Sequence, residues 1–471
     1  MLFSSVTFLY AFLPIVLVLY FAAPKKLKNF VLLLASLFFY YFGERTYIAI
    51  MLISSITDWI WSLLIEHYRA KQKNHLTKWF LVGSLAVNLG LLVFFKYSDF
   101  FITNINALLG TSIPLTNVHL PIGISFYTFQ TLSYTIDVYR GKAKVQKNLV
   151  SFATFVCLFP QLIAGPIVRY TDVAQELDSR RHTLEKFALG IRRFAFGFGK
   201  KIVLANAMGE ICKNLIGSGE SNVLMYWMYA VCVSLQIYLD FSAYSDMAIG
   251  LGKMLGFSFP ENFDYPFISK SITEFWRRWH MTLGGWFRDY IYFPLGGSRT
   301  TTLKWLRNIL VVWFVTGFWH GAEWNFIIWG LYFGVLLVIE KLFLGDFLKK
   351  LGPVVQHMYL LFTVLISFVI FQVQTDGGNI FTALSGMFGV GTDSLTDTKT
   401  LYIVKSNLIL IVAAIIGSTP LPKKLWNSFA KTKAGQIVSV VAEPVSIAAI
   451  ILFGTALLVD SSYNPFLYFR F

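Results

Sequence analysis

The sequence predicts an all-α polytopic integral membrane protein, and three observations lead to this fold class. Of the 471 residues, 56% are hydrophobic and only 14% are charged, whereas globular proteins carry about 25% charged residues. The mean hydropathy of +0.61 is too high for a soluble chain, which must cover its core with polar surface. Long apolar runs alternate with short basic loops, and about 20 apolar residues suffice for a helix to cross the bilayer. We expect a single membrane domain over residues 1–471, with about ten to eleven transmembrane helices plus re-entrant helices.

The apolar runs, taken in order, predict the individual spans. The first run, 1–24, is too long for a typical signal sequence and lacks a basic start, so we expect it to be retained as a span. Two basic residues or more separate most of the runs that follow. The predicted spans are 6–22, 28–43, 46–66, 78–97, 121–139, 192–214, 224–252, 351–372, 401–418 and 440–459.

The net charge of +15 reflects membrane topology and does not indicate a nucleic-acid-binding protein. Lys and Arg cluster between the apolar runs, which is the positive-inside pattern of a polytopic protein. This pattern places the loop 373–398 and the C-terminal tail 461–471 outside the cytoplasm. We therefore expect the lipid bilayer as the partner of the apolar surface, and no nucleic acid. The loops predicted to be cytoplasmic are 25–28, 67–78, 140–147 and 420–433.

Two regions do not fit a simple alternation of spans and loops. Residues 150–170 are apolar but contain Pro160, Gly165 and Pro166, which interrupt a helix. Residues 271–335 are apolar and aromatic, yet they include Glu274, Arg277, Arg278, His280, Arg288, Asp289, His320 and Glu323. Irregular backbone and charge at membrane depth are tolerated only inside protein or beside a water-filled cavity. Both regions are therefore expected to be re-entrant or tilted elements around an internal chamber.

The most informative motif surrounds His320. Apolar runs precede and follow it, which predicts a helical hairpin with His320, Glu323 and Asn325 at its tip. Burying an imidazole, a carboxylate and an amide together is costly unless each has a partner. An isolated histidine would be structural, but Gly317 and Gly321 permit close helix approach beside this polar group. We interpret His320 as catalytic, with Glu323 and Asn325 lining the chamber.

A second motif contains Trp276, Arg277, Arg278, Trp279 and His280. The arginines could bind the phosphates of a donor through guanidinium forks while the tryptophans cover its adenine ring. They could equally form an interfacial anchor. His280 is either a second polar residue of the chamber or a headgroup contact.

A third motif lies within the apolar run 224–252 and contains the carboxylates of Asp240 and Asp246. Asp240, Tyr244 and Met247 share one helix face at i, i+4 and i+7. This face is either a polar seam between helices or part of the chamber lining. Three cysteines in apolar surroundings have no metal or redox spacing, so we expect no metal site and no bound cofactor.

Five segments resemble the bacterial branch of the membrane-bound O-acyltransferase (MBOAT) family. That branch includes the membrane subunits of alginate O-acetylation, peptidoglycan O-acetylation and teichoic acid D-alanylation. The resemblance covers about residues 1–345, with a core of about 115–345, and it rests on five motifs that occur in the family's order. These segments are 120–130, 159–166, 238–246, 275–285 and 318–325.

This resemblance implies a ring of helices around a thinned centre with a central tunnel. It matches His320 to the family's catalytic histidine and His280 to its second recurrent histidine. The C-terminal pattern Phe466-Leu-Tyr468-Phe-Arg-Phe471 resembles a motif of the small companion subunit in D-alanylation, where the tyrosine is implicated as an acyl carrier. An aromatic interfacial anchor is the alternative for Tyr468.

Together these features predict transfer of an acetyl or other short acyl group across the membrane, from a cytosolic thioester such as acetyl-CoA toward an extracytoplasmic polysaccharide hydroxyl. Delivery to the polymer is expected to need an extracytoplasmic partner acyltransferase of the serine-hydrolase type. A lipid-modifying acyltransferase is a closely related alternative. A transporter of a lipid-linked precursor is a more distant one, and it would favour inverted repeats, which the sequence does not display. The sequence does not identify the acceptor polymer.

Overall fold

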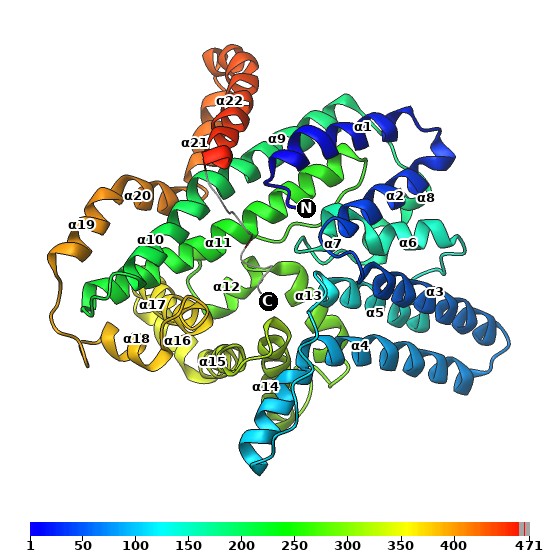
Figure 1. Cartoon of the computed structure of the whole chain (residues 1–471), viewed down its shortest axis with the longest axis horizontal. Helices are drawn as coiled ribbons and strands as arrows, with labels where there is room; N and C mark the ends of the chain where they lie inside the picture. The colour runs from blue at the N-terminus through cyan, green and yellow to red at the C-terminus, as the bar shows by residue number, and fades with distance from the viewer. Residues whose placement is uncertain (461–465, 467–471) are drawn as a thin grey trace. The chain divides into compact units, whose positions relative to one another are not determined.

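The described residues of the chain, 1–460 and 466, are helical throughout their regular elements (Figure 1). The structure is a computed structural model. Apart from one isolated bridge between Asn222 and Ser394, no β-structure occurs in this part of the chain. The all-α fold class predicted from the sequence is therefore confirmed.

The chain divides into two compact units. The first comprises Met1–Phe194 and Ser245–Glu261, and the second comprises Ala195–Tyr244 and Asn262–Phe471. Helices α9 (Leu184–Gly199) and α11 (Val223–Met254) contribute residues to both. This division does not test whether the units fold separately, so the single membrane domain stays a prediction.

In the first unit, some polar side chains are buried between helices, and apolar side chains cover part of the outer surface. Asp58 of α3 accepts hydrogen bonds from Ser84 (2.5 Å) and from Asn88 (2.8 and 2.9 Å) of α4, and all three are buried. On the outer face of α4, Trp79 is 70% exposed and Leu108 is 83% exposed. Such a distribution suits helices that face lipid. The helices of this unit besides α9 and α11 are α1 (Leu13–Ala22), α2 (Lys28–Tyr41), α3 (Ile48–Ala70), α4 (Asn74–Leu109), α5 (Ile124–Arg140), α6 (Leu149–Cys157), α7 (Phe159–Leu162) and α8 (Tyr170–Asp178).

The proline-containing region 150–170 forms short buried helices, so no continuous helix runs through it, as the prolines predicted. Helix α6 ends at Cys157, and Pro160 lies in the first turn of α7, where its missing N–H has no helical partner to lose. Nearly every residue between 151 and 168 is buried. Its irregular backbone is thus covered by protein, which is the condition for such backbone at membrane depth.

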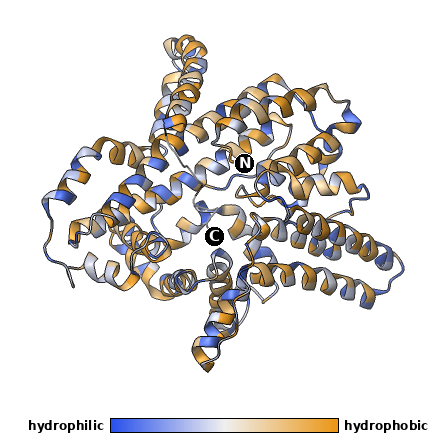
Figure 2. Cartoon of the chain, viewed as in Figure 1, coloured by the Kyte–Doolittle hydropathy of each residue, from blue (hydrophilic) through white to orange (hydrophobic). Residues whose placement is uncertain are grey.

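The second unit contains most of the remaining helices. Apolar residues cover long stretches of them, interrupted by polar positions (Figure 2). Phe466 is the one described residue of the tail that follows the last helix. The helices of this unit besides parts of α9 and α11 are α10 (Asn206–Ile216), α12 (Ile272–Arg278), α13 (Met281–Phe287), α14 (Thr302–His320), α15 (Trp324–Ile339), α16 (Gly345–Lys350), α17 (Pro353–Gln372), α18 (Ile380–Met387), α19 (Thr398–Ser406), α20 (Leu408–Gly417), α21 (Leu421–Ala430) and α22 (Lys433–Asp460).

Six helices among the described residues are long and apolar enough to cross a membrane. A seventh span results if α19 and α20, which are bent by 55°, count as one. The protein is therefore a multi-pass membrane protein. The larger number of spans expected from the sequence stays a prediction, since shorter apolar helices such as Phe8–Ala22 also occupy predicted spans. The six helices are Ile48–Ala70, Asn74–Leu109, Val223–Met254, Trp324–Lys350, Pro353–Gln372 and Lys433–Asp460.

Helices α14 and α15 form the predicted helical hairpin, with His320 as the last residue of α14. Two glycines bring the helices into close contact. A Cβ atom on Gly317 would lie 2.3 Å from the carbonyl oxygen of Phe326, and one on Gly330 would lie 2.3 Å from that of Trp313. Any larger residue at either position would force the helices apart, so the hairpin holds His320 against the first turns of α15.

Candidate active site

His320 lies in a box of aromatic rings within the second unit. The imidazole is 4% exposed. Its ring centroid lies 4.9 Å from that of Trp319, 5.0 Å from that of Trp329 on α15 and 5.4 Å from that of Phe371 on α17. All three rings stand at 74° to 85° to the imidazole. Packing on several sides fixes the orientation of the imidazole, as a catalytic group requires.

The two other polar residues of the hairpin tip differ from each other. Asn325 is 1% exposed, and its Nδ2 donates to the carbonyl oxygen of Phe371 at 3.0 Å. Its Oδ1 is buried and has no hydrogen-bond partner among the described residues. Glu323, which precedes α15, is exposed and does not share this burial. Its role in lining a chamber stays a prediction, whereas Asn325 lies in the interior.

His280 lies near His320, with one tryptophan ring in contact with both. It is 1% exposed and precedes α13 in a left-handed conformation (φ 43°, ψ 52°), which is costly for a residue with a Cβ atom. The centroid of its ring lies 4.7 Å from that of Phe241 and 6.2 Å from that of Trp319. The structure therefore brings the two histidines predicted from separate motifs to the same indole ring.

Asp240 of α11 forms a buried ion pair that the sequence did not predict. Its Oδ1 lies 2.6 Å from Nζ of Lys201, and both side chains are 4% exposed. The ring of Phe466 lies over the same Nζ at 4.6 Å and is 4.8 Å from the ring of Tyr244. Phe466 is itself 1% exposed, so part of the C-terminal tail lies inside the second unit. Tyr468 lies outside the described residues.

Asp246 belongs to the first unit and to another ion-pair group. Arg193 of α9 lies 2.7 Å from Asp246 and 2.6 Å from Glu261. These contacts fit the polar seam between helices that was one interpretation of the motif. A chamber-lining role for Asp246 stays a prediction without support from these contacts.

The paired arginines of α12 have different surroundings. Nε of Arg278 donates to Glu274 at 3.0 Å, and Nη1 donates to Asp264 at 2.8 Å. Arg277 is exposed, and no described residue forms a hydrogen bond or ion pair with it. Binding of donor phosphates by either arginine stays a prediction, and Arg277 is the one whose guanidinium is available.

The neighbouring tryptophans are packed into the aromatic core. The ring of Trp276 lies 4.5 Å from that of Trp313 and 4.9 Å from that of Phe333. The ring of Trp279 lies 5.1 Å from that of Phe368, and Trp279 is 5% exposed. Stacking of an adenine on either ring stays a prediction, and this packing does not favour it.

Glu340 holds the helix that carries the arginines, a role that the sequence analysis missed. It is 7% exposed, and its carboxylate accepts the backbone N–H groups of Ile272 at 2.7 Å and Thr273 at 3.0 Å. A carboxylate at a helix N-terminus accepts from backbone N–H groups that have no partner within the helix. Its negative charge also interacts favourably with the positive end of the helix dipole. The sequence did contain a signal for this role, because Glu340 is a single acidic residue directly after the apolar run that forms α15.

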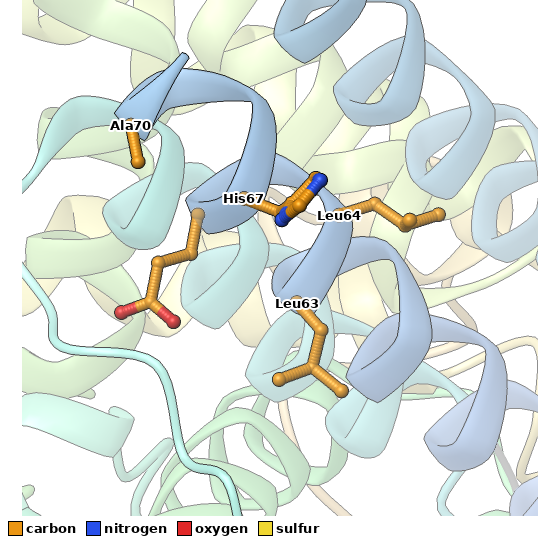
Figure 3. Close-up of a pocket in the computed structure, with 5 residues that line it drawn as sticks. Leu63, Leu64, His67 and Ala70 are labelled. Atoms are coloured by element: carbon orange, nitrogen blue, oxygen red, sulfur yellow. The ribbon is translucent and has the colours of Figure 1, made fainter.

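A pocket occurs elsewhere, along the last turns of α3 in the first unit (Figure 3). It is lined by Leu63, Leu64, Glu66, His67 and Ala70, all from one helix. None of the predicted site residues lines it. Among residues 1–460 and 466, no group of three or more His, Cys, Asp or Glu side chains could hold a metal ion.

Comparison of the sequence with those of known proteins identifies the family of the chain. Residues 140–373 match the sequence profile of MBOAT, the membrane-bound O-acyltransferase family. The chain is 37% identical to the probable alginate O-acetylase AlgI of Azotobacter vinelandii over the whole of both chains. It is 44% identical to the protein of that name from Pseudomonas syringae pv. tomato, over 72% of this chain and 66% of that one. The peptidoglycan O-acetyltransferase of Helicobacter pylori is 30% identical over 100% of this chain and 98% of its own.

Proposed function

The chain belongs to the membrane-bound O-acyltransferase family, and we propose that it transfers acetyl groups across the bacterial cell membrane for O-acetylation of an extracytoplasmic polysaccharide. It is a multi-pass membrane O-acyltransferase. The observation that carries the proposal is similarity over the full chain to proteins named alginate O-acetylase and peptidoglycan O-acetyltransferase. The two names describe transfer of an acetyl group to an oxygen of alginate and of peptidoglycan, respectively.

In this proposal His320 is the general base. A hydroxyl is a weak nucleophile at neutral pH, and a positioned base accelerates its attack by about 10²–10⁴-fold. The aromatic box and the 4% exposure of His320 support this role, because both hold the imidazole in place and limit water. His280 is the second histidine of the site, and the two share contact with Trp319.

The donor is proposed to be acetyl-CoA, which approaches from the cytoplasm. Arg277 is the proposed contact for the phosphates of the donor. Its side chain is exposed, whereas Arg278 is already paired with Glu274 and Asp264. Helices in a ring around a central tunnel would let the acetyl group reach the other side while CoA stays behind. The buried polar residues of the second unit, His280, His320, Asn325 and the Lys201–Asp240 pair, are the proposed lining.

Tyr468 is proposed to carry the acetyl group to the polymer-modifying partner, an extracytoplasmic acyltransferase of the serine-hydrolase type. The burial of Phe466 against Tyr244 and Lys201 supports this role. A tail held only at the membrane surface by aromatic anchors would not need an interior contact of this kind. The phenol, with an ordinary pKa near 10, needs a base to act as a nucleophile, and His320 is the proposed one.

Changing His320 tests the proposal. We expect His320→Ala to lower the amount of acetyl transfer at least about 100-fold, because the substitution removes the base. The assay would measure ester-linked acetate on the surface polysaccharide of a strain in which this chain is the only such O-acetylase. His75→Ala, at an exposed position in the first turn of α4, is the matched control and should keep normal acetylation. Near-normal acetylation by His320→Ala, with equal protein in the membrane, would refute the mechanism.

A further inference from the structure

Trp329 carries a buried hydrogen-bond donor that no described residue satisfies. Its side chain is 2% exposed, and its indole Nε1 has no hydrogen-bond partner in the described part of the chain. An indole N–H can only donate, and leaving a buried donor unpaired costs about 1–3 kcal/mol. Buried polar groups are nearly always paired in folded proteins. Several other buried side-chain atoms also lack partners among the described residues, and Trp329 differs from Trp61 and Trp276 in that its ring contacts His320.

This donor lies beside the proposed base. The ring of Trp329 is 5.0 Å from that of His320 and stands at 85° to it. Asn325 lies four residues earlier on α15, so it shares the helix face of Trp329. The Oδ1 atom of Asn325 is likewise buried and without a partner among the described residues. An unsatisfied donor and an unsatisfied acceptor therefore occur on the one face of α15 that meets His320.

We propose that the indole N–H of Trp329 donates a hydrogen bond to the carbonyl oxygen of the acyl group while it is transferred. This inference rests on the proposed function and adds a second catalytic group to it. A group that waits unpaired in the free protein stabilises a charge that develops there, because it needs no reorganisation at the moment of reaction. The low-dielectric aromatic surroundings strengthen such a hydrogen bond.

The attacking hydroxyl oxygen forms a bond to the thioester carbon, its proton passes to His320, and the carbonyl π electrons move onto the carbonyl oxygen. When the tetrahedral intermediate collapses, the C–S bond breaks, and the departing thiolate takes the proton from His320. The indole keeps its proton throughout. Because the carbonyl oxygen is fully charged only in the intermediate, the contribution of Trp329 belongs to kcat more than to KM.

The test compares two tryptophans that differ in their neighbours. Trp329→Phe keeps an aromatic ring against Phe333 and Phe371 but removes the N–H. We expect kcat to fall about 100-fold, as when an oxyanion donor is removed, while KM for acetyl-CoA stays within about threefold. The readout is the initial rate of transfer from radiolabelled acetyl-CoA in everted membrane vesicles, normalised to folded protein.

Trp61→Phe is the matched control. The Nε1 of Trp61 is also buried without a partner among the described residues, but Trp61 belongs to α3 in the first unit, where its ring lies 5.5 Å from that of Phe80. This variant should keep kcat within about threefold of the native value. Equal losses in both variants, or near-native kcat in Trp329→Phe, would overturn the proposal.

Two further comparisons keep the outcome decisive. Trp329→His restores a ring N–H and should be at least about tenfold more active per folded molecule than Trp329→Leu, whether or not Trp329→Phe folds well. Equal activity of those two variants contradicts the inference. His320→Ala is measured in parallel: if it stays active, the proposed function fails, whereas an inactive His320→Ala with a fully active Trp329→Phe removes only the inference about Trp329.

Discussion

Two buried polar groups in this protein differ in how completely their hydrogen bonds are satisfied. In the first unit, both oxygens of Asp58 accept hydrogen bonds from α4, and Oδ1 of Asn88 accepts from Ser54 at 2.7 Å and Thr131 at 3.2 Å. Around His320 in the second unit, Nε1 of Trp329 and Oδ1 of Asn325 lack partners among the described residues. The first group has the features of a structural network that joins α3, α4 and α5.

The difference separates stability from chemistry. A satisfied network inside a membrane protein holds helices together, since the apolar surroundings offer no competing water. Unsatisfied groups reduce stability, and a substrate that completes such a group beside the proposed base offsets that cost during the reaction. Substitutions in the Asp58 group should therefore change the free energy of unfolding, and substitutions near His320 should change turnover. The following predictions test this division.

The largest effect is expected at Tyr468. If its phenol receives the acetyl group, Tyr468→Phe should lower polymer acetylation at least about 100-fold, to the level of His320→Ala, while keeping the aromatic ring. Mass spectrometry of the C-terminal peptide, after incubation with labelled acetyl-CoA and no downstream acceptor, should find one added acetyl group in the native chain. Full activity of Tyr468→Phe would leave the tail as an anchor and send the acetyl group directly to the partner.

The Asp58 network should respond in stability alone. Asn88→Leu removes two donors from a buried carboxylate, which should lower the free energy of unfolding by about 2 kcal/mol. Thermal unfolding in detergent measures this loss, and acetyl transfer per folded molecule should stay within about threefold of native. Ser98→Ala, on the same helix but at a partly exposed position, is the control and should change neither quantity. A loss of turnover in stable Asn88→Leu would break the comparison.

Sequence reasoning succeeded where one segment contains its own evidence. Apolar runs on both sides of a polar tip predicted the α14–α15 hairpin, and the prolines predicted that the helix near residue 160 is interrupted. Pairings between distant segments could not be read in the same way. Lys201 falls within the predicted span 192–214, and nothing in the local pattern indicates that it pairs with Asp240 in the interior. The adjacent residues Arg277 and Arg278 could not be distinguished from the sequence. The local pattern shows neither the pairing of Arg278 with Asp264 nor the direction in which each side chain points.

Those arginines supply the prediction with the smallest effect. Arg277→Gln should raise KM for acetyl-CoA about tenfold with little change in kcat, because phosphates remote from the reacting carbon contribute mainly uniform binding. Arg278→Gln is the matched neighbour. It frees Glu274 and Asp264 from a partly exposed pair worth about 1 kcal/mol or less, so it should lower the melting temperature slightly and leave KM within about threefold. Steady-state kinetics in vesicles and thermal unfolding of both variants would distinguish these roles.

An unchanged KM for acetyl-CoA in Arg277→Gln would mean that Arg277 is an interfacial anchor and not a phosphate contact. A rise in KM of more than threefold in Arg278→Gln would mean that Arg278 leaves Glu274 and Asp264 to bind the donor. A side chain that is already ion-paired in the free protein would then also bind substrate.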